Sequence, residues 1–231
     1  YRHNLSDRQL TSSAFFVKRV RMEATPGTTL TDRILARAPE RSRGVLAAAY
    51  GTFLRFGVRR AAMQDIADQA GLSRAALYMH FRNKNDIFRA LMAHYYAAAA
   101  ELVAEALEQA DTPTEALRAA FAAQTGDAAI EMMASPHAEE LLSLKQSAAR
   151  DVIAEGGARL TAVYADWMQA GVAAGRISMT GAGPDPHVTA RAMLAALDGL
   201  KPLGAERAGY HAARDRLAVL FGRALTPQAR A

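Results

Sequence analysis

The stretch that decides the fold is MQDIADQAGLSRAALYMHF, residues 63–81, which has the parts of a helix-turn-helix at the required intervals. Ala67 is small where two helices would cross closely, and Gly71 lies four residues later, in the turn. Leu77 lies six residues further on, where it would lock the second helix to the first. Ser73 is a favourable N-cap for that second helix. Because such a helix lies in the major groove while the first crosses the DNA backbone, the segment predicts a DNA-binding module.

The rest of the chain is rich in helix formers. Alanine supplies 53 of the 231 residues, against 16 Gly and 8 Pro, and alanine has the highest helix propensity. Apolar residues recur every three or four positions after residue 41 and again after residue 84, which is the spacing of one helix face. Further helices are expected at residues 93–110, 114–126, 127–148, 151–174, 186–201 and 211–224. The pattern predicts an all-α protein.

The charge of the chain is divided unevenly along its length. The whole sequence has 28 Lys and Arg against 23 Asp and Glu, a net charge of +5. Residues 1–93 hold 16 basic and 7 acidic residues, net +9, whereas residues 94–231 hold 12 and 16, net −4. A basic block followed by an acidic one indicates a polyanion-binding module joined to a part that does not bind polyanions. Chance clustering on a solvated basic face is the alternative.

The segment from Arg41 to Leu91 resembles the tetracycline-repressor (TetR) family of bacterial transcriptional regulators. The signature is IADQAGLSRAALYMHFRNK, residues 66–84, in which Ile66, Ala67, Ala70, Gly71, Ser73, Leu77, Tyr78, Phe81 and Lys84 fall in register. The resemblance implies an N-terminal helix-turn-helix domain of three helices and a C-terminal helical domain that binds a ligand and forms a dimer. The expected division is a loosely ordered extension at 1–37, the DNA-binding domain at 38–88 and the effector-binding and dimerisation domain at 89–231.

The residues expected to contact DNA surround the second helix of the motif. They are Arg41, Arg43, Ser73, Arg74, Ala75, Ala76, Tyr78, His80 and Lys84. The two alanines are short enough for close approach, and their methyl groups suit thymine methyls. Arg74 is expected to hold either a guanine edge or a phosphate. The resemblance implies that Tyr78 and Lys84 hold phosphates and that His80 lies near the DNA backbone.

Several of these residues have a plain structural alternative. Tyr78 at helical spacing is also compatible with core packing, and His80 with partial burial and a local hydrogen bond. Arg41 and Arg43 either flank the DNA groove or are solvated charges. Residues 1–21 form either a loose extension or an arm that contacts DNA through Lys18, Arg19 and Arg21.

One departure from the family pattern concerns the first helix of the motif. The family usually has Thr or Ser before this helix, where the hydroxyl caps the helix and touches a phosphate, whereas this chain has Ala61 and Ala62. Losing such a cap costs about 1 kcal/mol, and one phosphate contact is expected to be missing. Arg59 and Arg60 lie just upstream and are candidates to supply charge instead.

The C-terminal part offers a candidate effector pocket and a candidate dimer face. Aromatic, Met and His residues between the two ends suit an apolar or aromatic effector, with ordinary core packing as the alternative; they are Tyr95, Phe121, Met133, His137, Tyr164, Trp167 and Met168. Apolar stripes near the end predict a two-fold dimer through a four-helix bundle. The residues of this face are Met193, Leu194, Leu197, Leu200, Leu217, Leu220 and Phe221.

Several function classes are disfavoured by what the sequence lacks. It contains no cysteine, which removes disulfides, thiolate metal sites and cysteine nucleophiles and favours a reducing compartment. It has no HExxH, GxSxG or phosphate-binding Gly-rich loop. No enzyme activity, cofactor, metal or membrane span is therefore expected.

The expected function is that of a cytoplasmic homodimeric repressor. It would bind a near-palindromic operator in double-stranded DNA and be released by a small-molecule effector. Two alternatives stay open: a regulator that acts through protein contacts without DNA, and a helical enzyme or small-molecule binding protein.

Overall fold

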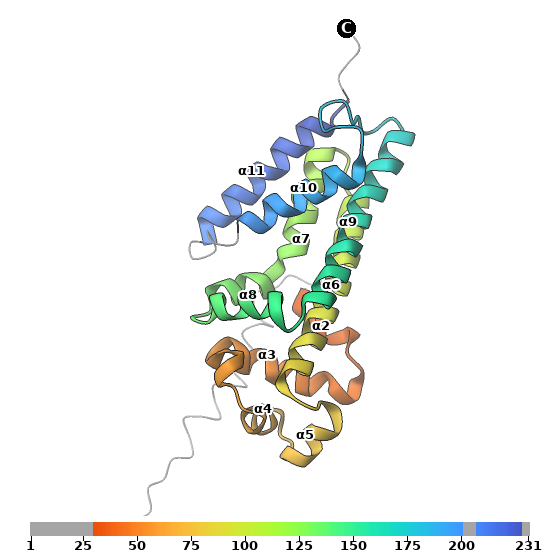
Figure 1. Ribbon diagram of the computed structural model, residues 1–231. Helices are drawn as coiled ribbons and strands as arrows, with labels where there is room; N and C mark the ends of the chain where they lie inside the picture. The colour runs from red at the N-terminus through yellow and green to blue at the C-terminus, as the bar shows by residue number, and fades with distance from the viewer. Residues whose placement is uncertain (1–29, 201–206, 228–231) are drawn as a thin grey trace, which may run out of the picture.

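The computed structural model describes residues 30–200 and 207–227, apart from the side chains of residues 127–129, 144–147 and 207–208. These ranges form helices joined by short connections and contain no strand, so the predicted all-α class is confirmed (Figure 1). The helices are α2 (Leu30–Arg37), α3 (Glu40–Arg60), α4 (Met63–Ala70), α5 (Arg74–His80), α6 (Lys84–Glu108), α7 (Pro113–Ala134), α8 (Ala138–Ser147), α9 (Arg150–Ala173), α10 (Pro186–Gly199) and α11 (Arg207–Leu225).

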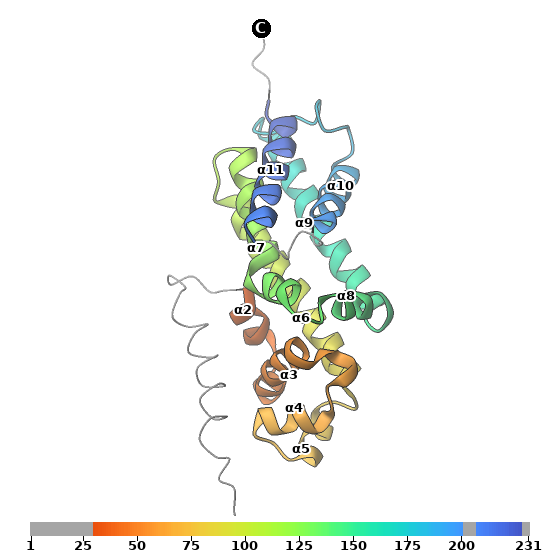
Figure 2. The same ribbon diagram turned by 90° about the vertical axis from the view of Figure 1, so that its left-hand side faces the viewer.

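The helices form an elongated molecule with a small group at one end and a larger bundle at the other. Helices α3, α4 and α5 make the small group, and α6 runs from it into the bundle, where it packs against α7 and α9 (Figures 1 and 2). Helix α11 packs on α7, and α10 packs on α9. No helix in the described ranges is long and apolar enough to cross a membrane.

Two clusters of buried apolar side chains correspond to these two groups. The first joins α3, α4, α5 and the start of α6 through residues such as Val45, Ile66, Leu77 and Ile87. The second joins α6, α7, α9, α10 and α11 and contains Phe121 among its fully buried members. A helix-turn-helix module with its own core is therefore attached to a helical bundle by the shared helix α6.

The segment before residue 38 departs from the expectation of a loose extension. Residues Leu30–Arg37 form α2, which lies against α6 and α7. Its Leu30 and Ile34 are buried in the bundle core, and its Arg33 pairs with Glu105 of α6 at 2.8 Å. The apolar pattern of these eight residues is too short to predict a helix. Leu30 and Ile34 are buried because α6 and α7 cover them. The basic group at Lys18, Arg19 and Arg21 lies outside the described residues.

Two other boundaries differ from the expected helices. Helix α6 is continuous from Lys84 to Glu108, although separate helices were expected before and after residue 93. The helix expected at residues 127–148 is divided, since α7 ends at Ala134 and α8 begins at Ala138. Pro136 lies in this break, where its missing N–H and fixed ring interrupt a helix.

Candidate DNA-binding surface and effector cavity

The helix-turn-helix is built as the sequence predicted. Gly71 follows α4 in the left-handed conformation (φ 68°), and the next N–H, that of Leu72, donates to the Ala67 carbonyl at 2.9 Å. Ala67 and Leu77 are fully buried between the two helices. Glycine adopts positive φ without the steric cost that other residues meet. The turn therefore fixes the angle at which α5 leaves α4.

The start of α5 presents a polar and weakly apolar face to solvent. The Ser73 hydroxyl accepts a hydrogen bond from the Ala76 N–H at 3.1 Å, as an N-cap should. This bond uses one lone pair of the oxygen, so the hydroxyl hydrogen is still available to a phosphate. Ser73, Arg74 and Ala75 are exposed and Ala76 is half-buried. The first turn of α5 is thus open to a DNA groove.

Arg74 and Tyr78 lie together one turn apart on that face. The Arg74 guanidinium is 5.6 Å from the centroid of the Tyr78 ring, and its Nη2 donates to the tyrosine hydroxyl at 3.4 Å. Tyr78 is 43% exposed, so the core-packing alternative for this residue does not describe its position. The pair keeps a cation and a hydroxyl at the solvent edge of α5.

Met79 is a candidate contact that sequence reasoning missed. Its side chain is 87% exposed on α5, and it lies four residues after Ala75, so the two share a helix face. An exposed thioether beside two alanines suits apolar contact with thymine methyl groups. The spacing of four residues between Ala75 and Met79 was the sequence signal that could have indicated this contact. His80 is half-buried, and together with Arg41 and Met79 it lines a hollow of about 590 Å³ between α5 and the start of α3.

Lys84 and Arg43 are held by the protein itself. The Lys84 ammonium donates to the Arg59 carbonyl at 2.6 Å and to the Ala61 carbonyl at 3.0 Å, which ties the start of α6 to the α3–α4 connection. The Arg43 guanidinium donates to the Leu35 carbonyl at 3.0 Å at the end of α2. Arg41 is exposed. Exposure is compatible with both alternatives for Arg41, whereas Arg43 has a structural bond that neither alternative included.

The alanines before α4 are compensated in part. The Ala62 N–H donates to Asp65 Oδ2 at 2.8 Å, so the helix start keeps one side-chain partner. Ala62 itself has no side-chain acceptor for the first N–H groups of α4. Arg59 and Arg60 are exposed beside it. This end of the module has cations available but no hydroxyl at the usual position.

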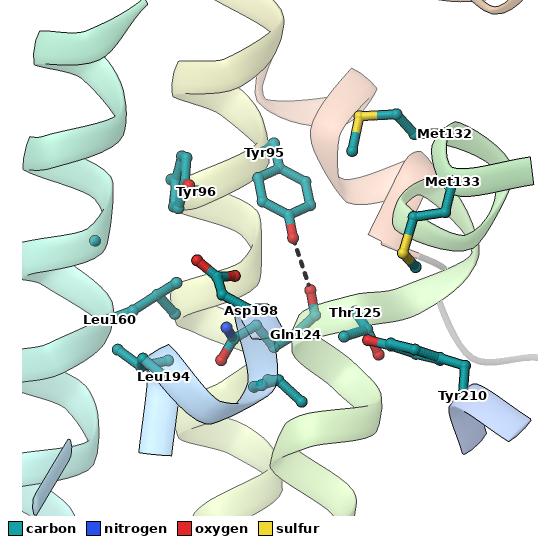
Figure 3. A pocket seen from close by; sticks show the side chains of 12 residues that line it. Tyr95, Tyr96, Gln124, Thr125, Met132, Met133, Leu160, Leu194, Asp198 and Tyr210 are labelled. Carbon is teal, nitrogen blue, oxygen red and sulfur yellow. Dashed lines mark hydrogen bonds between the residues drawn. The ribbon is translucent and has the colours of Figure 1, made fainter. Parts of the chain in front are cut away.

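A cavity lies in the bundle between α6, α7, α9, α10 and α11. Its walls combine aromatic, thioether and aliphatic side chains with a few polar groups (Figure 3). The lining residues are Tyr95, Tyr96, Gln124, Thr125, Met132, Met133, Gly157, Leu160, Leu194, Leu197, Asp198 and Tyr210. The volume is about 70 Å³. Such a lining, mostly apolar with few polar groups, is typical of small-molecule sites.

Two tyrosine hydroxyls beside this cavity are hydrogen-bonded to Gln124, and burial keeps three tyrosines protonated. Tyr95 donates to the Gln124 carbonyl and Tyr164 donates to Gln124 Oε1, each at 3.0 Å. Burial raises the pKa of Tyr95 and of Tyr164 well above the ordinary tyrosine value. Burial, with a smaller contribution from Asp198, raises the pKa of Tyr96 to about 12. All three are therefore neutral donors at physiological pH.

The structure brings together only part of the predicted pocket. Tyr95 and Met133 line the cavity, and Tyr164 reaches it through Gln124. Phe121 and Met168 are fully buried core residues.

Trp167 and His137 lie elsewhere, and their assignment to this pocket is corrected. Trp167 lines a separate small hollow beside the α6–α7 connection, because its position on α9 is far along the helix from Leu160. His137 follows the Pro136 break and its Nε2 lies 3.2 Å from the Arg55 carbonyl of α3. The cavity residues Tyr96, Gln124, Asp198 and Tyr210 were missed, since only tertiary packing brings α10 and α11 to α6.

The predicted dimer face is also divided by the structure. Met193 and Leu197 are buried in the core of their own chain, so their assignment to an interface is corrected. Leu194, Leu200, Leu217 and Phe221 are half-buried against the same core. Leu220 is 57% exposed on α11, and Val188, which was not selected, is exposed on α10. An apolar stripe in the sequence does not show which of its residues pack inside their own chain and which stay exposed for a partner.

The far end of α7 connects the cavity to the DNA-binding module. Met132 lines the cavity and also belongs to the apolar core of α3–α5. The Tyr50 hydroxyl of α3 donates to Glu131 Oε2 at 3.0 Å, and the Ser135 hydroxyl donates to the Leu54 carbonyl at 2.7 Å. A displacement of this part of α7 would therefore break or shift its hydrogen bonds to α3.

Comparisons with known proteins agree with this arrangement. Residues 45–91 match the model of the family described as bacterial regulatory proteins, tetR family. The chain is 40% identical over 60 residues to the transcriptional repressor BepR of Brucella suis biovar 1, which is 26% of this chain and 29% of BepR. This match thus spans less than a third of that relative.

Two solved structures share the fold. A TetR-family regulator from Rhodococcus sp. has a TM-score of 0.64 at 24% identity, covering 81% of this chain and 99% of that one. The SmeT–triclosan complex has a TM-score of 0.61 at 21% identity, covering 83% and 94%. SmeT is the repressor of a multidrug efflux pump of Stenotrophomonas maltophilia. At these identities the likeness concerns the fold.

Proposed function

Since this chain belongs to the TetR family through its DNA-binding domain, we propose that it is a ligand-responsive transcriptional regulator that binds DNA as a homodimer. The observation that carries the proposal is the open face of α5, where Ser73, Arg74, Tyr78 and Met79 project from a rigidly packed turn. A face with a donor hydroxyl, a guanidinium and an apolar side chain has the groups that phosphates, guanine edges and thymine methyls require.

A symmetric dimer reads a symmetric operator. Two copies of α5 related by a two-fold axis would enter successive major grooves, so the half-sites are expected about 34 Å apart or at a multiple of that distance. Leu220 and Val188, both exposed near the end of the bundle, support α10 and α11 as the dimer face. We propose a repressor, as the relative BepR is, acting in the cytoplasm where its operator lies.

Ligand response would act through the far end of α7. An effector that widens the cavity by displacing Met132 would also disturb the DNA-binding module, because Met132 is shared with the core of that module. The ligand must bind the state that does not fit DNA more tightly than the state that does, and the two affinities are then reciprocally linked. The effector is proposed to be apolar or aromatic, in keeping with the lining.

Selection of bound fragments from the source genome tests the DNA-binding function. A recurring near-palindromic sequence is expected, and its affinity should fall steeply between 50 and 200 mM salt because phosphate contacts release counterions. Recovery of unrelated fragments, or an affinity that salt hardly changes, would overturn the proposal.

A regulator that acts through protein contacts is the second candidate. It is favoured by the missing hydroxyl at Ala62 and by the engagement of Lys84 with backbone carbonyls, which leave fewer free groups for phosphates. Under that candidate, Tyr78→Phe and Lys84→Ala would leave regulation unchanged in cells. Under the DNA-binding proposal, both variants weaken operator binding.

A further inference from the structure

Three helix ends meet beside the C-terminal end of α5. The Lys84 ammonium at the start of α6 donates to the Arg59 carbonyl at 2.6 Å and to the Ala61 carbonyl at 3.0 Å, in the connection from α3 to α4. Only residues 81–83 separate the end of α5 from the start of α6. The α3–α4 connection is therefore fixed next to the helix that is proposed to read DNA (Figure 1).

The backbone of this connection is held from several sides. The Arg59 N–H donates to Glu140 Oε1 of α8 at 2.5 Å, while the Arg59 carbonyl accepts from Lys84. The Ala62 N–H donates to Asp65 Oδ2 at 2.8 Å. These N–H groups are occupied, so an anion at this junction has to be bound mainly by side chains. Because the backbone is fixed, those side chains start from defined positions.

Three exposed arginines flank this junction without a carboxylate partner. Arg59 and Arg60 end α3, and Arg82 lies between α5 and α6. Among the residues that the structure describes, none of their guanidinium groups forms an ion pair. By contrast, Arg33 and Arg89 pair with carboxylates of neighbouring helices at 2.8 and 2.6 Å. The three guanidinium groups can therefore be bound by an anionic partner without breaking an existing ion pair.

The carboxylates at the junction bind other groups. Asp65 and Glu140 accept from backbone N–H groups, as described above, and Asp86 accepts from the Asn83 side-chain amide at 3.3 Å. Each of these carboxylates supports a helix end or the connection before it. None is bonded to the three arginines in the described part of the chain.

The position of the arginines suits the phosphates of duplex DNA. In a helix-turn-helix the second helix lies in the major groove while the first crosses the DNA backbone. Arg59 and Arg60 immediately precede the first helix, α4, and Arg82 follows the second, α5. The planar guanidinium group binds a phosphate through two parallel hydrogen bonds. The arginines thus stand at both ends of the motif, where the DNA backbone passes.

Given the DNA-binding function proposed for this chain, we propose that Arg59, Arg60 and Arg82 form a phosphate clamp beside α5. The clamp binds phosphates that border the major groove, and the bonds of Lys84 hold the backbone that carries Arg59. Phosphate contacts carry no sequence information, so the clamp strengthens binding to operator and to unrelated DNA alike. It supplies donors at the end of the module where Ala62 has no hydroxyl.

Salt titrations of the full-length protein test the clamp. Fluorescence anisotropy measures affinity between about 50 and 200 mM salt, for a genome fragment recovered by selection and for a duplex of the same length with scrambled sequence. The test variants are Arg59→Gln/Arg60→Gln and Arg82→Gln. The control, Arg118→Gln/Arg176→Gln, removes two exposed arginines from the bundle and changes the net charge as much as the double test variant does.

The expected result is a smaller salt dependence for both duplexes. Each lost phosphate contact lowers the magnitude of the slope of log affinity against log salt by about 0.9, and a dimer loses the contact twice. We expect a decrease of roughly 3–4 for Arg59→Gln/Arg60→Gln and of about 2 for Arg82→Gln. The double variant should bind both duplexes about tenfold or more weakly, by a similar factor. The control should change the slope by less than about 1.

The outcomes separate the clamp from the proposed function. If the parent binds the selected fragment and both test variants keep its slope, the clamp is wrong and the regulator stands. A loss confined to the selected fragment would also overturn the clamp, because it would mean that these arginines read bases. An equal loss in the control would show that net charge alone is responsible. A parent that binds neither duplex would refute the regulator and the clamp together.

Discussion

The kink of α7 at Gly126 makes a demanding prediction about stability. Gly126 has φ 44° and ψ −176°, a conformation that residues other than glycine rarely adopt. A Cβ at this position would lie 2.7 Å from Cβ of Leu30, which is 3% exposed in the bundle core. Because the obstacle is the root of a side chain on α2 rather than a flexible tip, α2 itself would have to move.

The cost of Gly126→Ala follows from the backbone strain at this position and from the clash with Leu30. The backbone strain is worth about 1–3 kcal/mol, and partial exposure of Leu30 adds about 1–2 kcal/mol. We expect the free energy of unfolding to fall by about 2–5 kcal/mol, and the melting temperature to fall by roughly 4–20 °C. Urea and thermal unfolding followed by circular dichroism measure both quantities.

Gly157→Ala is the matched control. Gly157 lies inside α9, and a Cβ there would meet nothing within 4 Å. Alanine in an unobstructed helix interior should stabilise the protein by about 0.5–1 kcal/mol. The contradicting result would be a Gly126→Ala variant with the same free energy of unfolding as the parent, while Gly157→Ala gains stability. That result would refute the described kink of α7 and the packing of α2 against it.

Three further predictions concern charged groups. Arg89 lowers the pKa of Asp151 to about 2 through a hydrogen bond, so the stability from this pair is present above the unfolded value near 3.9 and is lost as pH falls toward 2; Asp151→Asn should flatten that part of a stability–pH curve. Burial, with Arg37, lowers the pKa of His94, so the folded state should lose stability as pH falls through about 6.5, and His94→Gln should lose this dependence in the same titration. Lys84→Met should lower the free energy of urea unfolding by about 1–2 kcal/mol, because it removes the ammonium bonds to two backbone carbonyls; an unchanged unfolding curve would contradict that bonding.

The helix-turn-helix could be predicted because its determinants are local. Ala67, Gly71 and Leu77 each answer a steric requirement within fifteen residues, and Ser73 caps a helix through its own backbone neighbours. The structure has all four in these positions. Turns, helix contacts and caps of this kind can be predicted from the sequence because the interacting groups are separated by short stretches of chain of fixed length.

The cavity could be predicted only in part because its walls come from distant helices. Tyr95 lies on α6, Asp198 on α10 and Tyr210 on α11, and no sequence spacing relates them. Trp167 was expected in the pocket with the other aromatic residues, but its position along α9 places it at a separate hollow beside the α6–α7 connection. Lys84 shows a similar limit at the DNA-binding end, since its carbonyl partners come into view only when α3 and α6 are packed together.

The most direct test of the account compares two exposed arginines in operator binding. Fluorescence anisotropy with a genome fragment recovered by selection would be measured for the parent, for Arg74→Ala on α5 and for Arg118→Ala on α7 in the bundle. The account predicts that Arg74→Ala weakens binding by about 1–3 kcal/mol per half-site, while Arg118→Ala leaves it within about twofold. Equal affinities for all three proteins would contradict the claim that α5 is the surface that reads DNA.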